Sequence, residues 1–418
     1  MQNCYHDRRK ALMDRLEPST AVFIFSGKAP MRSQDESYPF VVDRSFYYLT
    51  GIDRENMTLM LKKAPDGAVN ETLFIEPYSE FWAKWVGGRM KADEATEVSG
   101  VQDIRYHEDF PSALNRLVSG FQGLGQLKVG LDFWRYNEDQ TDTPAHRLAK
   151  TLQERYPAVQ IVDIRGDLAA LRMIKDEYEI EQMKKAQIAT AEAVRAMMRH
   201  AKPGMNEAEL EGAFDFSLAC QGEREHAFPS IVAGGGRATT LHYSDNNQVV
   251  NDGEMVLIDL GSAHGHYCAD ISRTFPINGK FTARQKAVYD TVLAAQDLVI
   301  KNARPGLTLR ELNNMVVEYY ETALDKLQLL QNGKTVGDYY YHGVSHHLGL
   351  DTHDVSNPVM VKLQPGMVVT VEPGLYIEEE AIGVRIENDI LITEDGCVDL
   401  SAGLLKTAED IERFMAGE

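Results

Sequence analysis

Short apolar, β-branched runs alternate with amphipathic helical patterns along the whole chain, which predicts strands and helices mixed in one fold. In the first part of the chain, strands are expected at residues 21–25, 45–50, 57–61, 72–75, 128–131 and 160–162. Helices are expected at residues 5–16, 111–119 and 143–155. This mixture favours a sheet with helices packed on it.

A change of pattern near residue 165 marks the expected domain boundary. Arg165-Gly166-Asp167 interrupts the pattern, and a long amphipathic helix follows from Lys175 until Pro203-Gly204 stops it. At 418 residues the chain is long enough for two domains. We therefore expect an N-terminal α/β domain over residues 1–165 and a second domain over residues 166–418.

The second domain contains a pair of strands with one acid each. Residues 255–260 form an apolar run interrupted by Asp259, and residues 266–275 carry Asp270. A two-residue turn at 264–265 would place the two aspartates directly opposite each other, with Cβ atoms about 4.5–5.5 Å apart. Such a pair repels unless a cation or a shared proton lies between the carboxylates. The alternative is one buried Asp bonded to backbone amides and one Asp that faces solvent.

An internal repeat indicates that this unit occurs twice. Residues 201–210 match residues 303–312, and each position lies 102 residues further on. Each copy ends a helix at Pro-Gly, then offers a cap residue, Asn206 or Thr308, with a glutamate three residues later. This is the spacing of a capping box. The match predicts a duplication, so the second copy should carry its own acidic strands.

The expected second pair of strands is present. Residues 367–377 and 382–393 are β-branched runs, interrupted by Glu372 and Glu387 respectively. Pairing around the polar turn at 378–381 would bring these two acids opposite each other. Two such strand pairs predict a pseudo-twofold sheet on which four acids converge, and four buried carboxylates require cations.

Histidines accompany the acids. Residues 342–354 hold four of the chain's twelve histidines, immediately before the third acidic strand. A single histidine is usually a satisfied core or surface residue, but this density favours a site with a nitrogen ligand. His242, just before the first acidic strand, is a further candidate.

Composition restricts the partners and the compartment. A net charge of -20 argues against nucleic acid or an anionic membrane as the main partner. The first residues lack the apolar core of a signal peptide, and no apolar run approaches the ~20 residues that span a bilayer. The four cysteines are widely spaced without a Cys-x-x-Cys pattern, which favours reduced thiols and a cytoplasmic protein.

Taken in order, these motifs resemble those of the pita-bread metallopeptidases, and specifically the branch of aminopeptidase P and prolidase. The motifs that carry the resemblance are Ile258-Asp-Leu-Gly, Ala269-Asp-Ile-Ser-Arg-Thr-Phe, His342-Gly-Val-Ser-His, Val371-Glu-Pro-Gly and Gly383-Val-Arg-Ile-Glu. The resemblance spans the chain, because those enzymes also carry an N-terminal α/β domain. It implies an α+β fold, in which a C-terminal pseudo-twofold pita-bread domain follows that N-terminal domain in the sequence.

The resemblance also implies a site with two metal ions. Its ligands would be Asp259, Asp270, His346, Glu372 and Glu387, with Asp270 and Glu387 touching both ions. His242, His342 and His353 match histidines that contact the substrate and its transition state, Arg385 a supporting arginine, and Tyr376 a pocket residue. Oxygen-rich ligation with one imidazole suits Mn²⁺, with Co²⁺ or Zn²⁺ as alternatives.

The implied activity is release of the first residue from peptides with proline second, with Glu372 transferring the proton. The alternatives are a prolidase restricted to Xaa-Pro dipeptides, a methionine aminopeptidase, and a non-catalytic relative. Ser345 looks slightly more like aminopeptidase P than prolidase. All five ligands are present, which argues against the non-catalytic reading. We also expect a homodimer or homotetramer, and we expect the aromatic cluster Phe81, Trp82 and Trp85 to serve the core or an interface.

Overall fold

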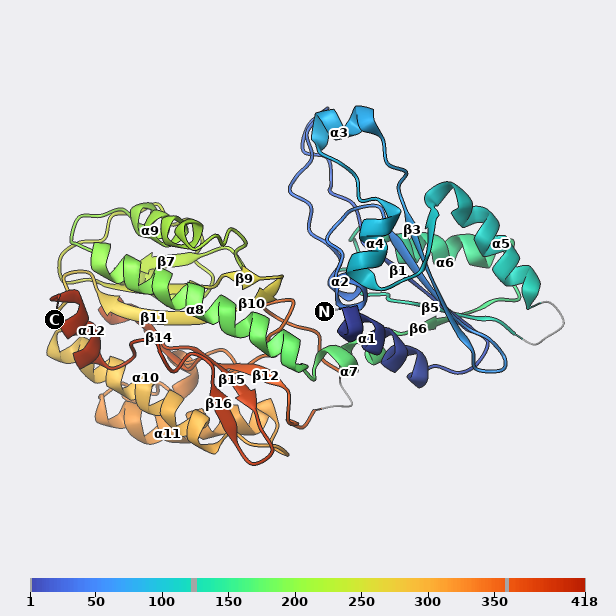
Figure 1. Ribbon diagram of the computed structural model, residues 1–418. Coiled ribbons are helices and arrows are strands. Elements are labelled where there is room, and N and C mark those ends of the chain that lie inside the picture. The colour runs from blue at the N-terminus through green and yellow to red at the C-terminus, as the bar shows by residue number, and fades with distance from the viewer. Residues whose placement is uncertain (1, 122–125, 358–360, 418) are drawn as a thin grey trace. The chain divides into compact units, whose positions relative to one another are not determined.

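The computed structural model describes residues 2–121, 126–357 and 361–417, which form two compact units, Met1–Arg172 and Met173–Glu418 (Figure 1). The expected boundary after residue 165 falls at the start of helix α7 (Arg165–Arg172). This helix contacts α1 (Gln2–Arg15) and lies within the first unit.

The first unit is built on one six-stranded mixed sheet of order β4-β3-β2-β1-β5-β6. Its strands are β1 (Thr20–Phe25), β2 (Thr58–Lys63), β3 (Val69–Ile75), β4 (Asp103–Tyr106), β5 (Lys128–Leu131) and β6 (Gln160–Asp163). The remaining helices are α2 (Arg44–Thr50), α3 (Glu80–Val86), α4 (Ala92–Ser99), α5 (Phe110–Gly120) and α6 (Pro144–Arg155). The predicted sheet with packed helices is therefore confirmed.

The prediction of a strand at residues 45–50 is wrong, because this segment belongs to helix α2. Asp43 caps the helix by accepting a hydrogen bond from the Phe46 amide at 2.8 Å, and Gly51 ends it in the left-handed conformation. Every residue from Ser45 to Thr50 is buried. A short helix enclosed on all sides has no polar face, so its sequence reads like a buried strand.

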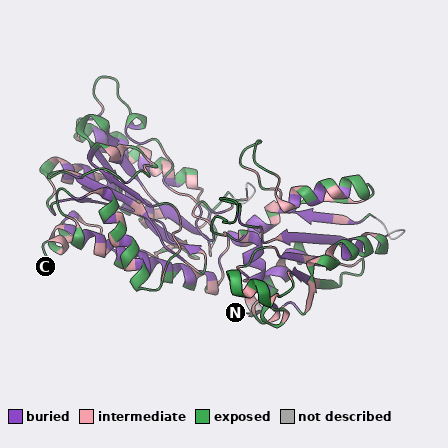
Figure 2. Cartoon of the chain, turned by 90° about the horizontal axis from the view of Figure 1, so that it is seen from above, coloured by how far each residue is buried: buried purple, intermediate pink, exposed green. Residues whose placement is uncertain are grey.

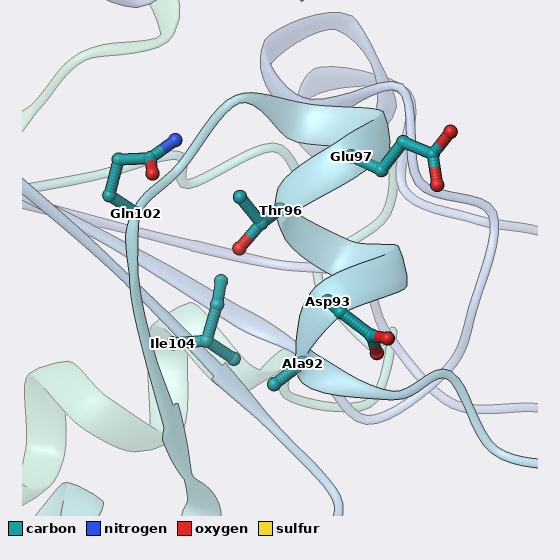
Figure 3. Close-up of a pocket in the computed structure, with 6 residues that line it drawn as sticks. All are labelled: Ala92, Asp93, Thr96, Glu97, Gln102 and Ile104. Carbon is teal, nitrogen blue, oxygen red and sulfur yellow. The ribbon is translucent and has the colours of Figure 1, made fainter.

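The aromatic cluster does not belong to the core of the first unit. Phe81, Trp82 and Trp85 on α3 are 61%, 47% and 72% exposed, so the core role is excluded and the interface role stays a prediction. A separate hollow of about 650 Å³ lies between α4 and β4 (Figure 3). It is lined by Ala92, Asp93, Thr96, Glu97, Gln102 and Ile104, none of which is an expected site residue.

The second unit has the predicted internal symmetry. Helices α8 (Glu177–His200) and α9 (Glu207–Cys220) pack together, as do α10 (Ala283–Asn302) and α11 (Leu309–Lys326) (Figure 1). Both predicted capping boxes are confirmed, at Asn206 and at Thr308. Each cap residue also forms a β-bridge, with Val249 and Lys362 respectively, so the two copies share the same local structure.

The first strand pair of this unit keeps its acids on one face, but its register differs from the expected one. Strand β8 (Met255–Leu260) pairs antiparallel with β11 (Ile271–Pro276), and Asp259 lies opposite Ser272 rather than Asp270. The turn residues are Gly265 and His266, both with positive φ, which is the geometry of a tight hairpin. This two-residue shift keeps Asp259 and Asp270 on the same face as diagonal neighbours, typically ~7–8 Å apart between backbones.

The second strand pair has the predicted register. Leu375 lies opposite Val384 and Val371 opposite Asn388, a register that sets Glu372 against Glu387. The strands are β12 (Val368–Val371), β13 (Gly374–Ile377), β14 (Ile382–Arg385) and β15 (Asn388–Ile392). Both acids sit in the breaks between these strands. The remaining elements are β7 (Ile231–Gly234), β9 (Ala263–His264), β10 (Tyr267–Cys268), β16 (Cys397–Asp399) and α12 (Ala408–Met415).

One apolar core extends through the second unit and joins its two halves. It includes Met197 from α8, Phe214 from α9, Tyr289 from α10 and Leu324 from α11, all fully buried, together with the apolar faces of the strands. Figure 2 shows the strands of each unit as its most buried elements and green exposed faces on the helices. Among the described residues, no helix combines the length and the apolarity that a membrane crossing requires.

Candidate metal centre

Three expected ligands from different segments meet in the second unit. Ligand atoms of Asp270, His346 and Glu387 lie within 4.8 Å of one another. Asp270 precedes β11, His346 lies in the loop before β12, and Glu387 lies between β14 and β15. Asp270 and Glu387 are buried, and His346 is partly buried. A closely spaced imidazole and two carboxylates form a typical donor set for a divalent cation.

The orientation of the His346 ring prepares one nitrogen for a cation. Its Nδ1 donates to the carbonyl of His347 at 3.1 Å, which leaves a lone pair on Nε2. That Nε2 lies 3.4 Å from Asp270 Oδ2 and 3.5 Å from Glu372 Oε1. Three acceptor atoms therefore face one another, an arrangement that a proton or a metal ion makes favourable.

Asp259, the fourth acid, is held by Arg385. The Arg385 guanidinium donates from Nη2 to Asp259 Oδ2 at 2.7 Å and from Nη1 to the Tyr376 hydroxyl at 3.0 Å. The other oxygen, Asp259 Oδ1, is buried and has no hydrogen-bond partner among the described residues. A buried carboxylate oxygen without a donor is costly, so this atom is suited to a cation.

Three polar residues that the sequence analysis did not single out orient the acids. Ser272 donates to Glu387 Oε2 at 2.8 Å and accepts from Arg385 Nε at 2.8 Å. Thr370 accepts from the His346 amide at 3.1 Å and donates to Glu372 Oε1 at 3.5 Å. Asp389, fully buried, accepts from the Asp270 amide at 3.0 Å and from the Gln187 side chain. Each lies two positions from an expected ligand in sequence, which places it on the same face of the strand.

Two further expected histidines, His342 and His353, lie against this cluster, and His342 Nδ1 is 3.8 Å from Glu372 Oε2. His342 Nδ1 donates to the carbonyl of Gly343 at 2.9 Å, so its Nε2 accepts from the Tyr376 hydroxyl at 2.8 Å. The ring of His353 lies 4.4 Å from that of His346, between centroids. Burial lowers the pKa of His353, with a smaller contribution from His242. His242 and His353 are exposed, as residues that meet a ligand from solvent would be.

The electrostatics of the cluster favour bound cations. Burial, followed by the charge of Glu387, raises the pKa of both Asp270 and Glu372 well above the usual range. Burial and the charge of Asp259 do the same for Glu387. Burial lowers the pKa of His346 to about 4, so this imidazole is neutral at neutral pH. Buried acids at this spacing ionise together only when positive charge compensates them.

A buried ion pair fixes the loop that carries His346 and His353. Lys175 Nζ lies 3.2 Å from Asp354 Oδ2, and both side chains are 1% exposed. Asp354 also donates its amide to the carbonyl of His347 at 2.9 Å. The loop is thereby tied to the segment that precedes α8, which keeps its histidines in place without regular secondary structure.

Two known family models match the chain, one within each of its two compact units. Residues 181–394 match metallopeptidase family M24, and residues 5–124 match the aminopeptidase P N-terminal domain. The Xaa-Pro aminopeptidase of Escherichia coli K12 is 33% identical over 430 residues, covering 98% of this chain and 97% of that relative. Human Xaa-Pro aminopeptidase 3 is 32% identical over 412 residues, covering 94% of this chain and 80% of that relative.

Solved structures show the same architecture. Aminopeptidase P from E. coli, determined with the inhibitor Pro-Leu, is 32% identical with a TM-score of 0.90, over 100% of this chain and 98% of that chain. Proline aminopeptidase P II from Yersinia pestis is 32% identical with a TM-score of 0.89, over the whole of both chains. The α+β fold with a C-terminal pita-bread domain is thereby confirmed, and the chain belongs to metallopeptidase family M24, among the Xaa-Pro aminopeptidases.

Proposed function

We propose that this protein is an Xaa-Pro aminopeptidase that uses two divalent metal ions to release the first residue of peptides with proline second. The observation that carries the proposal is the Nε2 atom of His346, which faces oxygens of Asp270 and Glu372 at 3.4 and 3.5 Å. The unpartnered Oδ1 of Asp259, stated above for the described residues, supports it. The proposed ligands are Asp259, Asp270, His346, Glu372 and Glu387.

Manganese is the proposed native metal. Four carboxylates and one imidazole make an oxygen-rich donor set, which suits a hard or borderline ion, and no thiolate is among the ligands to favour a softer one. Zn²⁺ and Co²⁺ remain alternatives, and a Zn-substituted form of the E. coli relative has been solved with product. When bound, the two ions would activate a water molecule and polarise the scissile carbonyl.

The side chains have separate proposed roles. Glu372 moves a proton to the leaving nitrogen, since its Oε1 lies 3.5 Å from His346 Nε2 and burial raises its pKa. His242, His342 and His353 bind the substrate and stabilise the charge that develops on its carbonyl oxygen. Arg385 orients Asp259, and Tyr376 lines the pocket while bonding to His342.

An Xaa-Pro bond is a special substrate because its nitrogen carries no hydrogen and the proline ring is rigid. A site that relied on that N–H group would fail to bind it. A closed pocket that fits the ring and reads the free N-terminus suits such a peptide. The E. coli relative was solved with the inhibitor Pro-Leu, which contains such a ring.

The direct test is hydrolysis of an Xaa-Pro-Yaa tripeptide by the Mn²⁺-loaded protein, followed by detection of the free first residue. We expect release of that residue, and Glu372→Gln should lower kcat by roughly 10²–10⁴-fold, because the glutamine cannot carry the proton. Absence of cleavage of any Xaa-Pro peptide with every divalent metal tried would overturn the proposal. Cleavage of Gly-Pro but of no longer peptide would identify a prolidase instead.

The proposed organisation follows the matched regions. We assign residues 1–165 to an N-terminal domain like that of aminopeptidase P and residues 166–418 to the catalytic domain, supported by the matches at 5–124 and 181–394. The exposed aromatic residues Phe81, Trp82 and Trp85 favour a homodimer or homotetramer that covers them. The four cysteines lie far apart in the sequence without a Cys-x-x-Cys pattern, which favours reduced thiols and the cytoplasm.

A further inference from the structure

A buried carboxylate outside the metal centre binds the segment that carries His242. Glu207 is the first residue of α9, and its side chain is 0% exposed. Its Oε1 accepts from the Gly234 amide at 2.8 Å and from Arg237 Nε at 2.7 Å. Its Oε2 accepts from the Tyr243 hydroxyl at 2.8 Å and from the Gln248 amide at 3.0 Å.

The residues that supply these four donors lie on both sides of His242 in the sequence. Gly234 and Gln248 are the two ends of a fifteen-residue segment that runs from the end of β7 through one turn of 3₁₀-helix and into irregular structure. Tyr243 directly follows His242 in sequence. Irregular backbone has no ladder of its own to fix it, so the four charge-assisted bonds to one buried carboxylate hold both ends and the middle of this segment, alongside the bonds that buried Asn246 makes with Val232 and Ser230.

The internal repeat shows that Glu207 is not needed to build the helix. In the second copy the corresponding residue of α11 is Leu309, whereas the capping box is present in both copies. Helix α11 therefore begins in the same way without a buried carboxylate. The acid at this position in the first copy serves the segment 234–248, which differs between the halves.

The segment is also joined to the other side of the site. The hydroxyl of Tyr341 donates to the carbonyl of Thr239 at 2.7 Å, and the ring of Tyr341 lies 5.2 Å from that of Tyr376. This bond sets segment 234–248, and with it His242, against the residue that precedes His342 in sequence.

We infer that Glu207 is a positioning residue for His242: by holding both ends and the middle of segment 234–248, it keeps this histidine where it meets the substrate. The inference rests on the proposed function of His242. Among the described residues, the side-chain bonds that the structure gives Glu207 all go to segment 234–248 and none to a proposed metal ligand, so it acts through that segment.

The test is a double-mutant cycle on the full-length, Mn²⁺-loaded protein with an Xaa-Pro-Yaa tripeptide. Glu207→Gln replaces one acceptor oxygen by a donor amide that faces existing donors, and it should lower kcat/KM by roughly 10²-fold through misplacement of the histidine. In the His242→Ala background the same change should have little further effect, because the positioned group is gone. An equal loss in both backgrounds would overturn the inference.

The matched control is Glu209→Gln on the same helix. Glu209 is exposed and accepts only from the Asn206 amide, at 3.1 Å, among the bonds that the structure gives it. We expect unchanged kcat/KM for this variant.

Tyr243→Phe removes one of the four bonds without altering charge. It provides a milder variant should Glu207→Gln fail to fold, and it should show a smaller loss that again disappears in the His242→Ala background.

Amide hydrogen exchange separates this inference from the proposed function. Glu207→Gln should increase exchange in segment 234–248 and leave β8, β11 and the bound Mn²⁺ stoichiometry unchanged, independent of any turnover. Unchanged exchange in that segment would contradict the inference even in an active enzyme. If the parent protein released no residue from Xaa-Pro peptides, the proposed function would fail, and the exchange result alone would decide whether Glu207 holds the segment.

Discussion

Asp259 and Asp270 are both expected to bind metal, but their surroundings predict different consequences when each is lost. Asp270 lies among His346, Glu387 and Glu372, whereas Asp259 is tied to Arg385 by one oxygen. We expect Asp270→Ala to lose both ions and Asp259→Ala to retain one. Metal analysis after equilibrium dialysis measures this. Equal occupancy in the two variants would contradict the distinct roles assigned to these aspartates.

At the scale of single residues, the sequence revealed the ligands more readily than the groups that orient them. A lone acid in a β-branched run is conspicuous, which is how Asp259 and Glu387 were found. Ser272 and Thr370 are ordinary residues in a strand, where a hydroxyl usually faces solvent or a backbone group. Asp389 offered a detectable signal, because it is a second acid two positions after Glu387 on the same face. The burial of Asp389 depends on tertiary packing, so the sequence alone did not predict it.

Among elements, the hairpin that carries both aspartates depends on a close approach at Gly261. A Cβ added there would overlap the carbonyl oxygen of Ala269, which is backbone and cannot move aside cheaply. We predict that Gly261→Ala lowers the melting temperature and weakens metal binding together, because the strands that hold Asp259 and Asp270 are forced apart. Calorimetry with and without Mn²⁺ measures both effects.

Gly212→Ala is the control for this substitution. Gly212 lies within α9, and among the described residues an added Cβ would meet no atom within 4 Å. Alanine is favoured over glycine in a helix by roughly 1 kcal/mol, so this variant should be slightly stabilised. A Gly261→Ala protein as stable as Gly212→Ala would show that the hairpin tolerates the extra carbon.

Strand registers and element types were predictable where the local sequence pattern is unambiguous. The turn at residues 378–381 lies between two long β-branched runs, so the register that sets Glu372 against Glu387 followed directly. The turn before Asp270 was misplaced by one residue at its centre. The sequence predicts a turn at residues 264–265, whereas the turn consists of Gly265 and His266, both in positive-φ conformations. A non-glycine residue in that conformation gives little warning in a sequence.

For the whole molecule, the buried acids make stability depend on both metal and pH. Without metal, raised pKa values mean that Asp270, Glu372 and Glu387 hold protons in the folded state at a pH where the unfolded chain has lost them. The contribution of these three acids to the free energy of unfolding is fully present below their pKa in the unfolded chain, about 4. It is lost as pH rises through their raised pKa in the folded protein. The metal-free protein should therefore become less stable as pH rises.

Bound cations should reverse this trend, because they stabilise the ionised carboxylates. We expect the melting temperature of chelated protein to fall between about pH 5 and about pH 8, and that of Mn²⁺-loaded protein to hold or rise over the same range. Differential scanning calorimetry of the two forms in matched buffers measures the difference. Parallel curves would contradict the view that these acids share a buried metal site.

Duplication, fold and site were visible in the sequence at the molecular scale because the repeat and the acidic strands recur in order. The last helix of the first unit was harder to predict, because α7 begins at Arg165 and so contains the Arg165-Gly166-Asp167 run that was expected to interrupt the pattern. Packing against α1, rather than local sequence, assigns that helix to the first unit.

The most direct test of the central claim is the number of Mn²⁺ ions bound per chain, measured by equilibrium dialysis and elemental analysis of chelated and reloaded protein. Four acids and one imidazole that converge in this way predict two ions per chain. Binding of a single ion, or of none, by correctly folded protein would contradict the dinuclear centre and the mechanism built on it.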